Sequence, residues 1–581
     1  MDPSKANPRE FQRQTIDAEI KSLEQSIRAL RFRRNTLAPI SSLPTEVFAA
    51  IFSLLRLPGT PALTGEPDHH LAWLSVTHVC HQWRSIALND PLLWRHIDFT
   101  NITLDGAAEM LTRAKKAPLH LQARVTGQPQ DGARFNAFER ALQSRVSHLC
   151  HVTISADSFY LHRTLERLLS PASTLEYLSL STEKMYRART PSRTSISSTL
   201  FDGVTPRLSC LVLDKCDISW TSPLLKGLKS LEIRTPSMNA RPSLADWLDT
   251  LEEMPQLRRL VLHSASPIAH PFPFNIERTI TLSFLTCLDL SASADDCVLA
   301  LSHLVPPSLT QLCLTARSDH PDGVDVLKFL PYVARHAHGP QDTKPLQSVL
   351  IRCEKKRMDI LAWPRPDIDL ELRDMRLLPA MQRTARVSLS LTCRHWPTEI
   401  YTEVFNASMA TLPLDNLVIL TAHRTRLDKQ AWLYHAPRWP LLERVRLAPC
   451  AARGLREMFL LQDHGQHESP LLPSLIRLDL IDDTALSARR TLRLCDALLK
   501  RVEQRVPLEV LDLRTCLATS YAVQLLGEIV VDILGPEEAL TRRVQRSSTW
   551  VPEDRGHFVY DDNSEEESND DDNEVVEMEE D

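Results

Sequence analysis

The sequence predicts a multidomain chain in which a small all-α helical bundle is followed by an α/β solenoid, with an amphipathic or coiled-coil helix before the bundle and a disordered acidic tail. Three observations support this prediction. Residues 40–99 space large apolar side chains at helical intervals, a six-residue leucine pattern recurs between residues 149 and 513, and residues 561–581 hold thirteen acidic residues and no basic one. The predicted domains are 1–38, 39–100, 101–540 and 541–581.

The first domain, residues 1–38, is predicted to form one amphipathic helix. Ile16, Ile20, Leu23, Ile27 and Leu30 recur at alternating spacings of four and three, which is the spacing of a coiled-coil seam. Roughly three heptads is the lower limit for such a seam. A homodimer through this helix and a single helix that folds back on the bundle are therefore both open.

The bundle in residues 39–100 is predicted to contain two main helices. The first begins at Leu43-Pro44, because proline at a helix start loses no hydrogen bond and apolar residues follow at helical spacing. The second is expected between residues 71 and 88, and Leu93-Trp94 supply a final apolar anchor. A core of about sixty residues is marginal alone and gains stability by packing against another surface.

Several residue types of this bundle match a known motif in order. The matching residues are Leu43-Pro44, Glu46-Val47, Ile51-Phe52, Val79-Cys80, Trp83-Arg84, Ala87 and Leu93-Trp94. The segment resembles the F-box, in its fungal-type form, and the resemblance implies docking on the Skp adaptor of a Skp-cullin-F-box ubiquitin ligase. By that resemblance, the candidate adaptor-binding residues are Leu43, Pro44, Val47, Ile51, Phe52, Leu55, Val79, Cys80, Trp83 and Trp94.

Two points about this resemblance stay open. The connection between the helices, residues 56–70, is longer and richer in Pro and Gly than the compact family pattern, so its contribution to docking is undetermined. A helical bundle that merely caps the next domain is the structural alternative.

Beyond residue 100 the chain repeats the pattern L-x-x-L-x-L with conservative replacements. Copies begin at Leu175, Leu208, Leu228, Leu257, Leu285, Leu309, Leu442, Leu475 and Leu508, with weaker copies at Leu149, Leu346 and Val387. Three copies place a cysteine three residues after the last leucine, at Cys216, Cys450 and Cys516. The pattern resembles the leucine-rich repeat, which implies stacked buried strands and inward-turned cysteines.

The copies are irregular, since their starts lie 20 to 33 residues apart within the two well-marked runs and the usual repeat length ends at about 29. Longer helices on the convex side, at Ala245–Met254 and Leu492–Val502, would account for the longer intervals. The pattern nearly disappears between Leu314 and Leu442. A non-repeating α/β domain is therefore the alternative to a degenerate solenoid.

Outward-facing strand positions are the candidate substrate-binding residues, because alternate side chains of a half-buried strand point away from the core. These positions are Tyr177, Ser179, Asp214, Glu232, Arg259, Asp289, Gln311, Arg446, Arg477 and Asp512. A solvated strand face explains each of them equally well.

Charge and composition indicate a cytoplasmic or nuclear protein. The formal net charge is −7, but without the thirteen acidic residues of 561–581 the rest of the chain carries 67 basic and 61 acidic residues, a net +6. No apolar run approaches the roughly 20 residues that span a membrane, and the start lacks a signal-peptide core. The twelve cysteines include no CxxC pair and are expected to be reduced, with no zinc site.

No catalytic or nucleotide-binding motif is present, and only 14 glycines occur, so no enzymatic activity, cofactor or metal is expected. The residues 68–70, Asp-His-His, lie in a polar connection and lack further ligands. No aromatic-basic motif supports nucleic-acid binding. The sequence thus predicts a substrate receptor that tethers an unknown target protein to the ligase, and the alternative is a ubiquitin-independent scaffold.

Overall fold

The computed structural model describes most of the chain up to residue 535. The described ranges are 8–55, 71–125, 131–183, 193–269, 278–307, 310–320, 323–338, 344–354, 356–366, 378–394, 398–423, 425, 427–447, 452–460, 470–481 and 485–535. The predicted acidic tail, the connection at 56–70 and Cys450 lie outside them.

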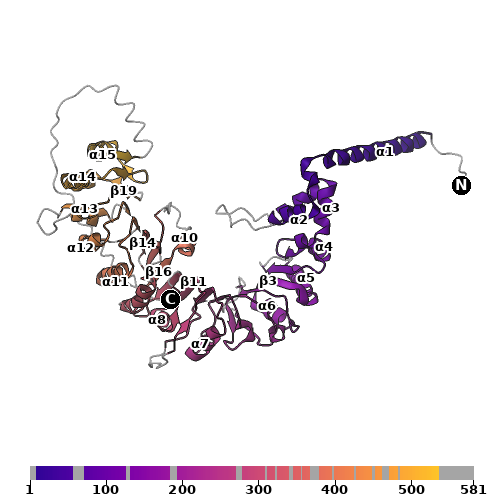
Figure 1. Ribbon diagram of the computed structural model, residues 1–581, viewed down its shortest axis with the longest axis horizontal. Helices are drawn as coiled ribbons and strands as arrows, with labels where there is room; N and C mark the ends of the chain where they lie inside the picture. The colour runs from indigo at the N-terminus through magenta and orange to yellow at the C-terminus, as the bar shows by residue number, and fades with distance from the viewer. Residues whose placement is uncertain are drawn as a thin grey trace, which may run out of the picture.

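The N-terminal part is helical (Figure 1). Its elements are α1 (Pro8–Thr36), η1 (Pro39–Ser42), α2 (Thr45–Leu54), η2 (Ala72–His78), α3 (His81–Asn89) and η3 (Pro91–Trp94). Helix α1 points away from the rest of the molecule, and Ile20 and Leu30 of its apolar stripe are 49% and 66% exposed. The helix therefore does not fold back on the bundle, and only its C-terminal part, from Arg28 on, approaches the start of α3, where the rings of Phe32 and His81 lie 5.9 Å apart.

The strands of the described residues form a 17-stranded sheet. In spatial order they are β1 (His96–Asp98), β2 (Leu119–Arg124), β3 (Leu149–Ala156), β4 (Tyr177–Thr182), β6 (Cys210–Asp214), β8 (Ser230–Arg234), β9 (Arg259–His263), β11 (Cys287–Ser293), β13 (Gln311–Arg317), β16 (Val387–Thr392), β15 (Arg357–Trp363), β14 (Ser348–Glu354), β17 (Ile419–His423), β18 (Arg444–Leu447), β19 (Arg477–Leu480), β21 (Val510–Asp512) and β23 (Asp532–Leu534). Three further pairs stand apart, β5 (Thr194–Ile196) with β7 (Cys216–Ile218), β10 (Ile280–Thr281) with β12 (Leu304–Val305), and β20 (Ala485–Leu486) with β22 (Leu517–Ala518).

Helices connect most of the parallel strands, as a parallel pairing requires a crossover. They are α4 (Leu104–Ala114), α5 (Asp131–Ser144), α6 (Ser158–Leu165), α7 (Leu244–Glu252), α8 (Ala294–His303), α9 (Leu330–Ala337), α10 (Leu378–Thr384), α11 (Thr398–Thr411), α12 (Lys429–His435), α13 (Ala452–Leu460), α14 (Ala488–Glu503) and α15 (Ser520–Leu526). Short 3₁₀ turns are η4 (Val146–His148), η5 (Leu200–Gly203), η6 (Pro223–Leu225), η7 (Met238–Ala240), η8 (Val324–Phe329) and η10 (Ala436–Arg438). Figure 1 shows an arc with strands along its inner side and most helices along its outer side, whereas α10 lies on the inner side.

The leucine pattern coincides with the strands. In all nine clear copies the strand begins two residues after the first leucine, as at Leu257, which precedes β9. The described pattern leucines are buried; Leu257, Leu260 and Leu262, for example, are all 0% exposed. Helices α7 and α14 overlap the two helices predicted at Ala245–Met254 and Leu492–Val502.

The weak stretch between residues 314 and 442 has a different strand order. Strand β15 runs antiparallel to both of its neighbours, β14 and β16. On the outer sides of this hairpin arrangement, β16 pairs in parallel with β13 and β14 pairs in parallel with β17. The sheet therefore stays continuous where the leucine pattern is interrupted.

One large apolar core connects the helical bundle with the sheet, and a second, smaller cluster of buried residues joins α10 to β14 and β15. One cluster of buried residues extends from Phe48 in α2 to Val530 before β23. Strand β1 lies within the predicted 39–100 domain and pairs with β2, so the bundle continues directly into the sheet. Among the described helices, none is both long and apolar enough to cross a membrane.

Candidate partner-binding surfaces

Helix α2 has a buried inner face made of aromatic side chains. Phe48 and Phe52 are both 0% exposed, and their ring centroids lie 5.8 Å apart. The half-buried Trp83 of α3 packs against both rings, at 5.6 and 5.2 Å. These contacts, together with Pro44 before the first turn, set the orientation of α2 in the bundle.

The opposite side of α2 exposes aliphatic side chains. Val47, Leu54 and Leu55 are 40%, 63% and 55% exposed, and Ile51 is half-buried. Positions i, i+4, i+7 and i+8 lie on one side of a helix, so these four residues form one stripe, the α2 outer stripe. Contiguous exposed apolar surface is a mark of a protein-binding site.

The start of α3 adds Val79, which is 58% exposed. The neighbouring Cys80 has a structural part, since its Sγ accepts a hydrogen bond from the Trp83 N–H at 3.5 Å and so caps the helix. Trp94 is 4% exposed, and its indole Nε1 donates to the Ala87 carbonyl at 2.8 Å. These contacts place Cys80 and Trp94 in the framework of the bundle.

The ten predicted adaptor-binding residues thus divide by exposure. Pro44, Val47, Leu55 and Val79 are exposed, Leu43, Ile51, Cys80 and Trp83 are half-buried, and Phe52 and Trp94 are buried. The two buried residues have no surface to offer a partner in this conformation. Leu54 was missed, although its position seven residues after Val47 is a signal for the same helix face.

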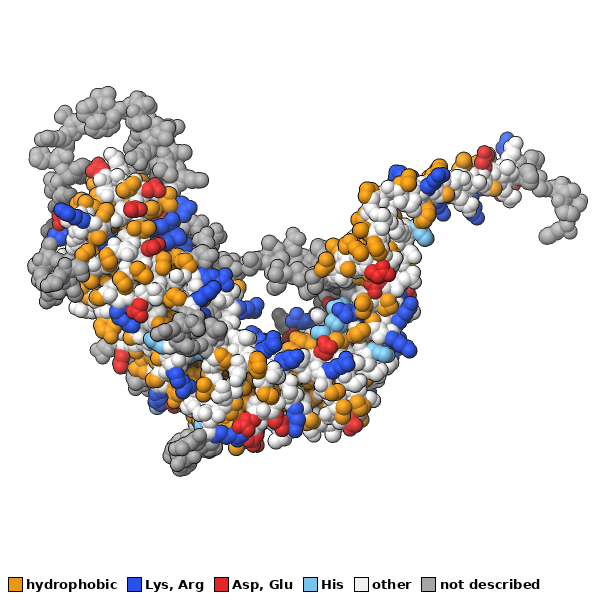
Figure 2. All heavy atoms as spheres, in the orientation of Figure 1, with side chains coloured by type: hydrophobic (Ala, Val, Ile, Leu, Met, Phe, Trp, Pro, Cys, Tyr) orange, Lys and Arg blue, Asp and Glu red, His pale blue; other side chains and the backbone are white. Residues whose placement is uncertain are grey.

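The predicted substrate-binding residues lie on the inner side of the arc, and several contact one another. Glu232 of β8 accepts hydrogen bonds from Arg234 and Arg259, at 2.8 and 2.7 Å. His263 lies 3.1 Å from Asp289. Figure 2 shows Lys and Arg side chains gathered along this inner side.

Other members of the predicted set lie farther along the same side. Tyr177 of β4 stacks on His151 of β3, with ring centroids 5.5 Å apart. Asp214 at the end of β6 accepts from the Ser181 hydroxyl at 3.2 Å. Ser179 and Gln311 are half-buried on β4 and β13.

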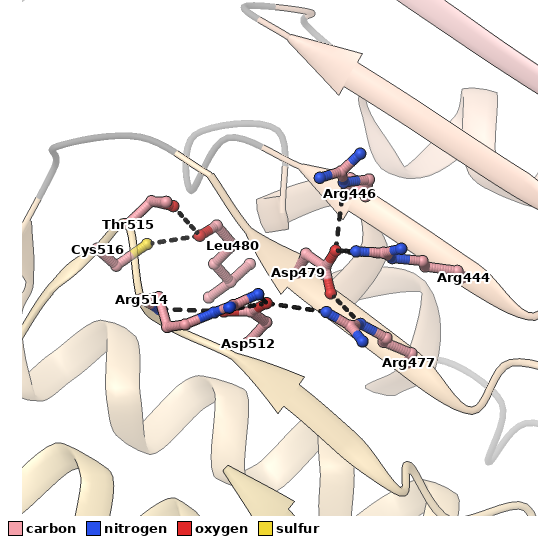
Figure 3. A network of polar contacts seen from close by, with 9 residues as sticks. All are labelled: Arg444, Arg446, Arg477, Asp479, Leu480, Asp512, Arg514, Thr515 and Cys516. Atoms are coloured by element: carbon pink, nitrogen blue, oxygen red, sulfur yellow. Dashed lines mark hydrogen bonds and ion pairs between the residues drawn. The ribbon is translucent and has the colours of Figure 1, made fainter. Parts of the chain in front are cut away.

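The C-terminal end of the sheet carries an arginine cluster, defined as Arg444, Arg446, Arg477 and Arg514 (Figure 3). Asp479, 2% exposed, is bound by three of these guanidinium groups, with ion-pair distances of 2.5 Å to Arg444, 3.2 Å to Arg446 and 2.7 Å to Arg477. Asp512 pairs with Arg477 and Arg514, at 2.9 and 2.7 Å. Four cations and two carboxylates leave this surface with two positive charges.

Burial alone would raise the pKa of Asp512, but hydrogen bonds from Arg514 and the charges of Arg514 and Arg477 lower that pKa below its ordinary value. The carboxylate is therefore ionised at neutral pH and is an integral part of the cluster. Sequence reasoning missed Arg444, Asp479 and Arg514. The position within the leucine pattern is the signal that could have identified Asp479, because Arg446, Asp479 and Asp512 occupy the same position in successive copies and are direct neighbours on adjacent strands.

The cysteines predicted to be structural are buried where they are described. Cys216 is 0% and Cys516 is 3% exposed. The Cys516 thiol donates to the Leu480 carbonyl at 3.0 Å, and burial raises the pKa of the Cys216 thiol to about 12. The Cys216 thiol is therefore protonated and not a nucleophile at neutral pH.

Comparison with known families identifies one part of the chain. A family model described as F-box-like matches residues 40–100, the bundle that carries the α2 outer stripe. No curated protein sequence matches the chain.

Proposed function

Because residues 40–100 match an F-box-like domain, and F-box domains generally bind Skp1-type adaptors, we propose that this protein is the substrate-recognition subunit of a Skp-cullin-F-box ubiquitin ligase. The observation that carries the proposal is the α2 outer stripe, an exposed aliphatic surface on that domain. Apolar surface of this kind is stabilised when a partner covers it. The adaptor would occupy the stripe, and the cullin complex would be bound through the adaptor.

The α/β region is, in this proposal, a degenerate leucine-rich-repeat solenoid that binds the target protein. The parallel pairing of successive leucine-pattern strands supports this assignment. The charged inner side of the arc is the proposed target-binding surface. A target bound there would have to carry charges complementary to those of the ion-paired side chains. Such electrostatic complementarity gives selectivity between targets.

The protein would contribute to ubiquitin transfer by position alone. A receptor that holds a substrate lysine near the charged ubiquitin carrier raises the effective concentration of the reacting groups. No reactive side chain of this chain is required for that role.

Capture of the Skp adaptor tests the proposal. The double variant Leu54→Asp/Leu55→Asp places two charges in the α2 outer stripe without touching the buried Phe48 and Phe52. We expect adaptor binding at least tenfold weaker than for the unchanged chain, measured by affinity capture and by titration with purified adaptor.

A matched control places two aspartates on exposed leucines elsewhere. Leu169 and Leu441 are 59% and 48% exposed and lie outside residues 40–100, so the variant Leu169→Asp/Leu441→Asp should bind the adaptor normally. Thermal unfolding of both variants checks that each is folded. If the unchanged chain does not bind the adaptor, the ligase proposal is wrong, and a ubiquitin-independent scaffold becomes the better description.

A further inference from the structure

A β-bulge lies between β2 and β3, close to the F-box-like bundle. Leu119 pairs with Leu149, but the next residue of β2, His120, pairs with His151. Cys150 therefore has no partner opposite it. In a regular strand Cys150 and His151 would point to opposite faces of the sheet, whereas a bulge redirects the side chain of the extra residue.

The bulge brings three metal-ligating side chains together. One ring nitrogen each of His120 and His151 and the Sγ of Cys150 lie within 4.8 Å of one another. The two imidazole rings are stacked, with centroids 4.0 Å apart, and Cys150 is 7% exposed. A buried cysteine and two half-buried histidines at this separation form a donor set that selects Zn²⁺ over Mg²⁺ and Ca²⁺.

A second observation points to a ligand. The Nδ1 atom of His151 is buried and has no hydrogen-bond partner among the described residues. A buried polar atom without a partner is costly, and a metal ion bound at Nδ1 would remove that cost. His96 continues the ring stack, but its Nε2 accepts a hydrogen bond from Arg95 at 3.2 Å.

We propose that His120, Cys150 and His151 form a Zn²⁺ site that joins β2 to β3. Donors of a tetrahedral zinc site are about 2.0–2.3 Å from the metal and therefore about 3.3–3.8 Å from each other. The donor atoms therefore have to approach by about 1 Å, and the two stacked rings have to rotate so that their nitrogen lone pairs converge on the ion. Three protein ligands leave the fourth position for water or a further ligand.

Charge at this site is mixed, and the thiol proton is accounted for. Glu176, Arg95 and Arg207 all act electrostatically on Cys150, so one carboxylate favours a cation and two guanidinium groups oppose it. Burial, and then the charge of Glu176, raises the pKa of the Cys150 thiol to about 11. Zinc binding replaces the S–H bond by a Zn–S bond and releases this proton to solvent.

Cobalt substitution tests the site in the full-length protein. After treatment with a chelator, the chain is titrated with Co²⁺, which gives a thiolate-to-cobalt charge-transfer band only when sulfur is a ligand. We expect this band at one Co²⁺ per chain and its loss on addition of Zn²⁺. Carboxylates of residues 561–581 that bind Co²⁺ would not produce it.

Two variants and one control complete the test. Cys150→Ser should abolish the band, and His120→Gln should weaken Zn²⁺ binding at least tenfold in competition with a chromophoric chelator. Cys210→Ser is the control, since Cys210 pairs with Tyr177 two strands from Cys150 and should leave both readouts unchanged. Absence of the band in the unchanged chain, or its persistence in Cys150→Ser, overturns the proposal. Circular dichroism confirms that the variants are folded.

Discussion

Arg501 is a fully buried cation, with an exposed fraction of 0%. Its guanidinium group donates to the carbonyls of Leu471, Leu472 and Leu475 at 3.1–3.2 Å and lies 4.7 Å from the centre of the Phe459 ring. Burial lowers its pKa to about 10, so it remains charged at neutral pH. The side chain therefore holds the turn that leads into β19, the strand of Asp479.

Replacing this side chain is predicted to destabilise the protein. Arg501→Leu leaves three buried carbonyls without their donor, and we expect a loss of about 3–5 kcal/mol in the free energy of unfolding, measured by urea unfolding. Arg493→Leu, an exposed position of the same helix, should change stability by less than about 0.5 kcal/mol. Equal unfolding midpoints for the two variants would contradict this assignment.

His435 is predicted to make stability depend on pH. Burial, and then the charge of Arg438, lowers its pKa from 6.5 to about 4, and its ring stacks on Trp439. Between these values the unfolded chain binds a proton that the folded chain does not. Stability is therefore complete above about pH 6.5 and falls as the pH drops toward 4, by about 2 kcal/mol near pH 5.

The measurement is the thermal midpoint near pH 7 and near pH 5, for the unchanged chain and for His435→Gln. Glutamine does not titrate, and its amide can still donate to Asn406 Oδ1, which lies 2.9 Å from His435 Nε2. The variant should lose less stability than the unchanged chain on acidification. An identical loss in both proteins would assign the effect to other groups.

At the scale of single elements, α1 is the helix whose apolar side is least covered. The stripe that Ile16, Ile20, Leu23, Ile27 and Leu30 form is 48–66% exposed along its length. Heptad spacing suits a seam with a second identical helix. Self-association through α1 therefore stays a prediction of the sequence, for which the structure leaves the necessary surface open.

Light scattering after gel filtration checks this prediction. Leu23→Asp/Ile27→Asp places two charges in the seam, and we expect the molar mass to fall by half, from dimer to monomer. Ser22→Asp/Gln25→Asp adds the same charge outside the seam and should leave the mass unchanged. A monomeric unchanged chain would show that α1 does not pair with a second copy.

The leucine pattern predicted some strands of the sheet correctly and missed others. Each clear leucine copy became a parallel strand at one fixed offset, because alternate apolar side chains in a short segment can be buried only on one face of a sheet. The placement of β15 could not be predicted, since an antiparallel strand inserted between β14 and β16 depends on pairings distant in the sequence.

At the scale of the whole molecule, the bundle and the sheet share one core. The Arg113 guanidinium of α4 lies 4.3 Å from the centre of the Trp94 ring in η3, and β1 follows directly. A continuous core predicts that the two parts unfold together. Such rigidity would hold the proposed adaptor and target surfaces at a constant separation, as positional catalysis requires.

Hydrogen exchange measured over a range of denaturant concentrations tests this coupling. Amides of α3 and β2 should exchange with the same free energy of opening and the same dependence on denaturant. Exchange of α3 at clearly lower denaturant, while β2 stays protected, would show that the bundle opens independently.

The sequence by itself determined the N-terminal helix, the helices of the F-box-like bundle and the strands of the leucine copies, because apolar spacing and helix-start residues act locally. Only the tertiary structure decided which of the predicted site residues are available to a partner, separating the exposed Leu55 from the buried Phe52. The tertiary structure also brings together the residues of the arginine cluster and the side chains of His120, Cys150 and His151. These depend on strand register and on one bulge, which are set by packing between residues far apart in the chain.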